Sequence, residues 1–160
     1  MKKLSERGIL FIRSFEGLKL TAYRDVKGIL TIGWGHTGPD VKAGMKVNEY
    51  QAENIFQKDL YEKSEKFVRP LEQKIGYELT QNQYDALCSL VFNTGPDAIA
   101  PANSIFRALK AHDIMKASQS ILIWNKVTVI DPETGKKVKK FCQGLYNRRL
   151  KEKELFDRTC

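Results

Sequence analysis

The chain has 160 residues, of which 42% are hydrophobic and 29% charged, and its 27 Lys and Arg against 19 Asp and Glu give a net charge of +8. This composition excludes disordered and fibrous chains, and it fits one globular domain or two small lobes that share a core. A chain of this length can bury roughly 70% of its unfolded surface, so it needs neither disulfides nor a metal to stay folded. The charge favours a polyanionic partner, which is a nucleic acid, a membrane surface or an acidic cell-wall polymer.

The first predicted element is a helix over residues 4–15, where apolar residues recur at helical spacing and Ser5 is the candidate N-cap. The basic residues before it resemble the start of an export signal, but Arg13 and Glu16 interrupt the apolar run. We therefore expect no export signal. Every apolar stretch of the chain is far shorter than the ~20 residues that a bilayer span needs, so we also expect no transmembrane segment.

Residues 20–34 change to β-branched and aromatic side chains around a turn at 25–28, which predicts a β-hairpin. Glycines and a proline then break the pattern before residue 40. We expect a small antiparallel β lobe over residues 17–47.

Asn48 opens a capping-box pattern, and apolar residues follow at helical spacing until Pro70. This pattern predicts a long helix over residues 48–69, ended by the proline. We expect this helix to connect the β lobe to a helical lobe formed by residues 70–160 together with 1–15.

Thr80 with Gln83 predicts the start of another helix, which ends at residues 93–96. Further helices are predicted over residues 103–111, 113–124 and 146–156, and an exposed hairpin over 126–141. The expected fold class is therefore α+β: a single domain in which a small antiparallel β lobe is joined by a long helix to a mostly helical lobe.

Three polar side chains of the first forty residues are candidates for catalysis. Glu16 follows the first helix, Asp25 lies at the hairpin turn and Thr31 lies in the returning strand. If the hairpin folds back beside the helix end, two carboxylates and a hydroxyl converge. Paired carboxylates in unlike environments carry out glycoside hydrolysis, because one stays protonated while the other stays ionised. A Glu and an Asp nine residues apart are common, so the spacing alone is a weak signal.

The order of the motifs resembles that of the phage-type lysozymes, which include the endolysins that open bacterial walls. Residues 16–36 have the acid, eight residues, Asp, five residues, Thr spacing of that family, and later family-like motifs follow at 92–95, 103–104, Trp124 and 144–156. The resemblance covers nearly the whole chain and is loosest at the predicted hairpin over residues 126–141. It implies a lysozyme-like fold that cleaves the β-1,4 bond between N-acetylmuramic acid and N-acetylglucosamine in peptidoglycan, by inversion and with no metal or cofactor.

The resemblance also implies roles for individual residues. Glu16 would be the general acid, Asp25 the carboxylate that orients or deprotonates the attacking water, and Thr31 a hydroxyl that helps to hold this water. Phe92 and Ser104 match positions that line the saccharide cleft. Phe92 is equally explained as a core aromatic residue, and Ser104 as the cap of its helix.

Arg148 matches a family arginine that approaches the catalytic glutamate. Its charge would lower the pKa of Glu16 whereas burial would raise it, and the sequence leaves the outcome open. We expect Arg149, Lys151 and Lys153 to face solvent on the same helix.

His36 has no second metal ligand at useful spacing, so we expect it to form a buried or interlobe ion pair. The cysteines, Cys88, Cys142 and Cys160, are odd in number and widely spaced, so we expect reduced thiols rather than a disulfide or a structural zinc site.

The expected partner is bacterial peptidoglycan, with the positive charge drawing a monomeric enzyme to the anionic envelope. Without an export signal, the chain would be made in the host cytoplasm and reach the wall through a membrane lesion such as a holin forms. The alternatives are a chitinase-like enzyme or lytic transglycosylase on the same scaffold, and a non-enzymatic cationic protein that perturbs the envelope. A nucleic-acid binder ranks last, because no recognition fingerprint accompanies the basic residues.

Overall fold

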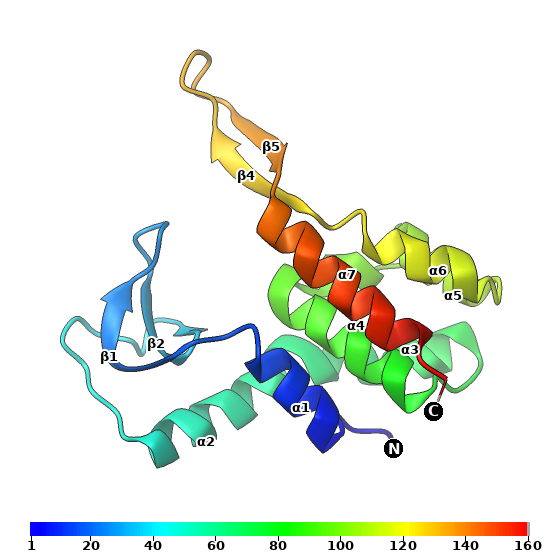
Figure 1. Ribbon diagram of the computed structural model, residues 1–160, viewed down its shortest axis with the longest axis horizontal. Coiled ribbons are helices and arrows are strands. Elements are labelled where there is room, and N and C mark those ends of the chain that lie inside the picture. The colour runs from blue at the N-terminus through cyan, green and yellow to red at the C-terminus, as the bar shows by residue number, and fades with distance from the viewer. Residues whose placement is uncertain (160) are drawn as a thin grey trace.

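The structure is a computed structural model that describes residues 1–159. Figure 1 shows a small β-sheet set apart from a group of helices, with α2 running between the two. In chain order the elements are α1 (Glu6–Arg13), β1 (Leu18–Arg24), β2 (Leu30–Trp34), β3 (His36–Thr37), α2 (Glu49–Leu60), the π-helical turn η1 (Tyr61–Glu65), α3 (Lys66–Ile75), α4 (Gln81–Thr94), the 3₁₀ turn η2 (Pro96–Ile99), α5 (Ser104–Lys110), α6 (Ile114–Ile121), β4 (Lys126–Ile130), β5 (Lys137–Phe141) and α7 (Gln143–Asp157). This architecture confirms the expected α+β fold.

The predicted N-caps are confirmed. The Ser5 side chain accepts a hydrogen bond from the Gly8 N–H at the start of α1. Asn48 and Thr80 form complete capping boxes at the starts of α2 and α4. Each box satisfies backbone N–H groups that a helix start otherwise leaves without a partner.

The predicted hairpin is confirmed as the antiparallel pair β1 and β2, to which β3 adds a short third strand. Tyr23 lies opposite Thr31 in the register, so both belong to the same face of the sheet. Asp25 is two residues beyond Tyr23, just past the end of β1. Because side chains alternate between faces, this register directs Asp25 toward the face that carries Thr31.

The prediction that Pro70 ends the connecting helix is wrong, because Pro70 lies inside α3. The helical run continues from α2 through η1 and α3 to Ile75. An interior proline costs about 3 kcal/mol. Leu71 and Ile75 follow it and are only 2% and 3% exposed, and burying each contributes roughly 1.5–3 kcal/mol, which offsets the proline.

The core lies among the helices, with α4 at its centre. α4 packs against α7, α1 and α3, and its eight residues from Tyr84 to Val91 are all buried, six of them apolar. Ser64 in η1 donates a hydrogen bond to the Cys88 carbonyl, which ties the π-helical turn to α4. The core of the helical lobe is therefore built around α4.

The predicted exposed hairpin over residues 126–141 is confirmed as β4 and β5, which project beyond α7 (Figure 1). Its base is closed by a hydrogen bond from the Cys142 N–H to the Asn125 carbonyl. We propose that the β lobe spans residues 17–47 and that the connector starts at residue 48. Within residues 1–159, no helix has the length and apolar character needed to cross a membrane.

Candidate active site

Glu16 lies just beyond the end of α1, where its N–H donates to the Arg13 carbonyl. Its side chain is 21% exposed and is held between two segments that are distant in sequence. Arg148 of α7 places Nη1 3.7 Å from Glu16 Oε1. Gly35, between β2 and β3, approaches so closely that a Cβ atom there would lie 2.5 Å from Glu16 Oε2. The fold thus brings Glu16 and Arg148 together, as the resemblance implies.

The environment of Glu16 raises the pKa of its carboxyl above the ordinary value. Burial is the largest cause, because it disfavours the charged form. The nearby charges of Arg148 and Lys63 lower the pKa but do not cancel the effect of burial. The sequence leaves open whether burial or the charge of Arg148 has the larger effect on this pKa. In the structure burial has the larger effect, so the Glu16 carboxyl keeps its proton to a higher pH than a free glutamate.

Asp25 and Thr31 are both fixed by the hairpin turn. Asp25 Oδ1 accepts hydrogen bonds from the N–H groups of Lys27 and Ile29, at 2.8 and 2.9 Å. Thr31 is 4% exposed, and its hydroxyl donates to the Ile29 carbonyl at 3.0 Å. The turn therefore holds a carboxylate acceptor and a hydroxyl on one face of the sheet.

Arg148 is held by three residues that surround its guanidinium group. Its Nη2 donates to the carbonyl and hydroxyl oxygens of Ser89 at 3.2 and 3.3 Å. The guanidinium lies 4.3 Å from the centre of the Phe15 ring, and Nε lies 3.8 Å from Glu152 Oε2. These contacts leave the side chain 8% exposed and fix the charge that faces Glu16.

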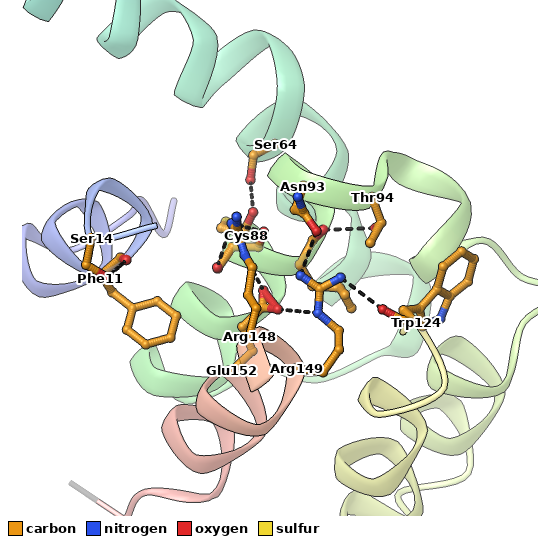
Figure 2. Close-up of polar contacts among 12 residues, drawn as sticks. Phe11, Ser14, Ser64, Cys88, Asn93, Thr94, Trp124, Arg148, Arg149 and Glu152 are labelled. Carbon is orange, nitrogen blue, oxygen red and sulfur yellow. Dashed lines mark hydrogen bonds and ion pairs between the residues drawn. The ribbon is translucent and has the colours of Figure 1, made fainter. Parts of the chain in front are cut away.

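The expectation that Arg149 faces solvent is wrong, because its side chain is fully buried. Its Nε donates to Glu152 Oε1 at 2.5 Å, and its other nitrogens donate to the Trp124 carbonyl and to Asn93 Oδ1 (Figure 2). Lys151 is exposed as expected, whereas Lys153 is half-buried and pairs with Asp157.

Sequence reasoning missed Glu152, which is fully buried between the two arginines. The signal was present, since acidic and basic residues three and four positions apart lie on one side of a helix. Asn93 and Ser89 carried no comparable local signal, because their partners lie 56 and 59 residues away.

Phe92 and Ser104 take no part in the polar contacts described above. Phe92 packs edge-on against Phe56 with ring centres 6.0 Å apart, and Lys63 Nζ lies 5.9 Å from its ring. Ser104 is the first residue of α5, so Asn103 rather than Ser104 takes the N-cap position, and Ser104 lines a cavity bounded by α5 and α6. The interpretation of Ser104 as a helix cap is therefore wrong, and cleft binding by either residue stays a prediction.

His36 lies between two carboxylates, where the ion pair expected from the sequence can form. Its Nδ1 lies 2.8 Å from Asp59 Oδ2, and its Nε2 lies 3.0 Å from Asp40 Oδ2. The hydrogen bond from His36 is the largest cause that lowers the pKa of Asp40. Because Asp59 belongs to α2, this cluster ties β3 to the connecting helix.

Cys88 and Cys142 are free thiols, and Cys160 lies outside the described residues. Among residues 1–159, no group of three His, Cys, Asp or Glu side chains could hold a metal ion.

Comparisons with known proteins find one family. A family model described as phage lysozyme matches residues 13–152. The chain is 36% identical over 154 residues to an endolysin of Acyrthosiphon pisum secondary endosymbiont phage 1, covering 96% of this chain and 97% of the relative.

Two solved structures also match nearly the whole chain. The endolysin from Escherichia coli O157:H7 phage FAHEc1 has a TM-score of 0.82 and 37% identity, covering 98% of this chain and 94% of that one. The muramidase domain of SpmX from Asticaccaulis excentricus has a TM-score of 0.80 and 30% identity, covering 99% of this chain and all of that one.

Proposed function

The chain belongs to the phage lysozyme family and is a glycoside hydrolase with peptidoglycan-lytic function, and on this premise we propose that it cleaves the β-1,4 bond between N-acetylmuramic acid and N-acetylglucosamine and thereby lyses the cell. The observation that carries the proposal is the partly buried Glu16 carboxyl, with a raised pKa, in contact with Arg148. A protonated carboxyl of this kind can donate to the leaving oxygen of a glycoside.

The residue roles form one mechanism. Glu16 donates its proton to the glycosidic oxygen as the bond to the sugar breaks. Asp25 orients or deprotonates the attacking water, and its two backbone hydrogen bonds keep the carboxylate in place. Thr31 helps to hold the same water with its hydroxyl.

The proposal extends to where the enzyme works. It is made in the host cytoplasm, acts as a monomer and reaches the wall after another protein, such as a holin, has opened the membrane. The net charge of +8 supports attraction of the enzyme to an anionic envelope.

The test is digestion of purified peptidoglycan by the wild type and by Glu16→Gln, with mass analysis of the fragments. Gln cannot donate the proton, and general acid catalysis is worth roughly 10²–10⁴-fold, so we expect the variant to lose activity by this factor. Wild-type products should contain one added water for each bond broken. Glu154→Gln, which removes an exposed carboxylate, is the control and should keep full activity.

Three results would contradict the proposal. Products with anhydro ends would identify a lytic transglycosylase. Undiminished lysis of cells by Glu16→Gln would identify a non-enzymatic mode of action. Activity of Glu16→Gln within a few-fold of the wild type on purified peptidoglycan would remove Glu16 from the mechanism.

A further inference from the structure

Arg13, the last residue of α1, contacts two other elements through its side chain. The carbon at the centre of its guanidinium group lies 5.1 Å from the centre of the Trp34 ring, at the end of β2. The same atom lies 5.0 Å from the centre of the Phe56 ring in α2. Its Nη2 donates to Glu53 Oε2 of α2 at 2.5 Å. One side chain therefore joins α1 to the β-sheet and to the connecting helix.

The two rings hold the guanidinium more closely than polar groups do. Phe56 is fully buried, Trp34 is partly buried, and their ring centres lie 6.2 Å apart. Within residues 1–159, the buried Nε of Arg13 has no hydrogen-bond partner. A cation over an aromatic ring is attracted more strongly where water is excluded, and the planar guanidinium can stack on a ring as an ammonium group cannot. These contacts therefore favour arginine over lysine at this position.

Both sides of this contact lead directly to Glu16. The Glu16 N–H donates to the Arg13 carbonyl at 2.9 Å, so the acid follows the end of α1. Trp34 is followed by Gly35, where a Cβ atom would lie 2.5 Å from Glu16 Oε2. Arg13 thus connects the two chain segments that meet at the Glu16 carboxyl.

The backbones of these segments pack on different partners. α1 packs on α4 in the helical lobe, whereas β2 packs on α2 and on β1. The Arg13 side chain therefore bridges two packed groups of elements, and Glu16 lies where these groups meet.

We propose that Arg13 is a positioning residue for the general acid, because it holds Trp34 beside the end of α1 and so keeps the Gly35 backbone against the Glu16 carboxyl. The inference rests on the proposed function, since that function makes Glu16 the general acid. Arg13 acts through Trp34 and Gly35 and not on the reacting atoms.

Loss of this contact should have two effects on Glu16. The carboxyl becomes free to leave its reactive position, which lowers kcat. It also becomes more exposed, and its pKa falls, because burial is the largest cause of the raised pKa. The charged groups that lower this pKa, Arg148 and Lys63, are unchanged. Loss of a positive charge alone would raise the pKa, so the direction of the shift distinguishes exposure of the carboxyl from a direct charge effect.

The test uses two variants of Arg13 and one matched control. Arg13→Gln removes both the charge and the guanidinium, and Arg13→Lys keeps the charge alone. The control is Arg69→Gln in α3. The Arg69 guanidinium lies 5.2 Å from the centre of the Tyr61 ring, its Nη2 lies 2.8 Å from Glu65 Oε2, and its Nε is also buried without a partner within residues 1–159. Arg69 thus makes the same kinds of contact within one helical run.

The measurement is kcat and KM on soluble glycan strands across the acidic and neutral pH range. We expect Arg13→Gln to lower kcat by about tenfold, which is less than the roughly 100-fold that a displacement of 1 Å can cost. Its alkaline limb should lie at lower pH than that of the wild type, because a general acid works only while protonated. Arg13→Lys should lie between the two, and Arg69→Gln should keep the wild-type limb.

Two results would overturn the inference. One is an alkaline limb at the wild-type pH, or above it, in Arg13→Gln. The other is an equal shift of the limb in Arg69→Gln, which would show that loss of any such arginine has the same effect. If Arg13→Gln does not fold, Arg13→Lys decides the question by the same criteria.

A titration without substrate separates this inference from the proposed function. The pKa of the Glu16 carboxyl is measured by carbon NMR in the wild type, Arg13→Gln and Arg69→Gln, which needs no turnover. A lower pKa in Arg13→Gln alone would support the role of Arg13 even if the wild type cleaved no glycan, a result that would refute the proposed function. Equal pKa values in all three proteins would overturn the role of Arg13 whether or not the glycan is cleaved.

Discussion

Glu16 depends on two single-residue features, the absence of a side chain at Gly35 and the charge of Arg148. Gly35 allows the backbone between β2 and β3 to close over the carboxyl, which contributes to the burial that raises its pKa. Arg148 opposes that rise but leaves the group protonated to a higher pH than free glutamate. Each feature can be removed separately.

Gly35→Ala should abolish most of the lytic activity. The new Cβ would lie 2.5 Å from Glu16 Oε2, so the carboxyl must move, and a displacement of about 1 Å at a reacting group can cost roughly 100-fold. Gly44→Ala is the matched control, because Gly44 has the same φ of +77° with open space around the added atom. Both variants should lose about 1–2 kcal/mol of unfolding free energy from the left-handed backbone, measured by denaturant titration. Full activity of Gly35→Ala would show that the contact does not position Glu16.

Arg148→Gln should move the alkaline limb of the pH profile to higher pH. A general acid works while it is protonated, so activity is lost as the pH rises through the pKa of Glu16. Arg148 lowers that pKa, and its removal therefore raises it further. The measurement is kcat/KM on soluble glycan from pH 4 to 9, with the exposed Arg158→Gln as control. An alkaline limb at the same pH in Arg148→Gln and the wild type would remove Arg148 from the electrostatics of Glu16.

At the scale of the element, α7 places its charged side chains in two different environments. Arg148, Arg149 and Glu152 are buried on the face toward α4, whereas Lys151 and Glu154 are exposed. Glu152 lies between the two guanidinium groups, with its oxygens 2.5 and 3.8 Å from their Nε atoms. The helix therefore fixes Arg148 through a buried carboxylate one turn away.

Glu152→Gln should destabilise the fold by about 3–5 kcal/mol, because it leaves the buried Arg149 guanidinium without its counter-charge and removes one of the two carboxylates beside Arg148. Glu154→Gln removes a carboxylate that is 69% exposed on the same helix and should change the unfolding free energy by less than about 1 kcal/mol. Denaturant unfolding of both variants measures the difference. Equal stability of the two variants would show that the buried cluster does not hold α7 in place.

Local sequence patterns predicted which helices and strands form. They predicted less well where these elements end and which charged side chains are buried. Asn48 begins its helix as expected, because a capping box is completed within four residues. The predicted helix end at Pro70 is wrong, because the burial of later residues in the core offsets the free-energy cost of the proline. The prediction that Arg149 is exposed is wrong, because its burial depends on Asn93 and Trp124, which are 56 and 25 residues away. Tertiary contacts of this kind leave no pattern in the local sequence.

At the scale of the whole molecule, the positive charge falls into two classes. Arg148 and Arg149 are buried in the helical lobe and act on their neighbours, whereas the lysines of the β4–β5 hairpin are exposed. Exposed charges act over a distance and are screened by salt, with a Debye length of ~8 Å at physiological ionic strength. Buried charges keep their effect in salt. The two classes should therefore respond differently to ionic strength.

Replacing Lys136, Lys137 and Lys140 by Gln should weaken lysis of whole cells at low salt. All three side chains are exposed, so their effect on cells comes from attraction of the enzyme to the anionic envelope. The loss should be several-fold at about 10 mM salt, where the Debye length is ~30 Å, and should shrink as the salt concentration rises. Cleavage of a short neutral glycan should stay within twofold of the wild type at every salt concentration, since that substrate offers no charge to attract. A loss on the neutral glycan, or a loss on cells that does not change with salt, would show that these lysines contact the substrate directly instead of attracting the enzyme to the envelope.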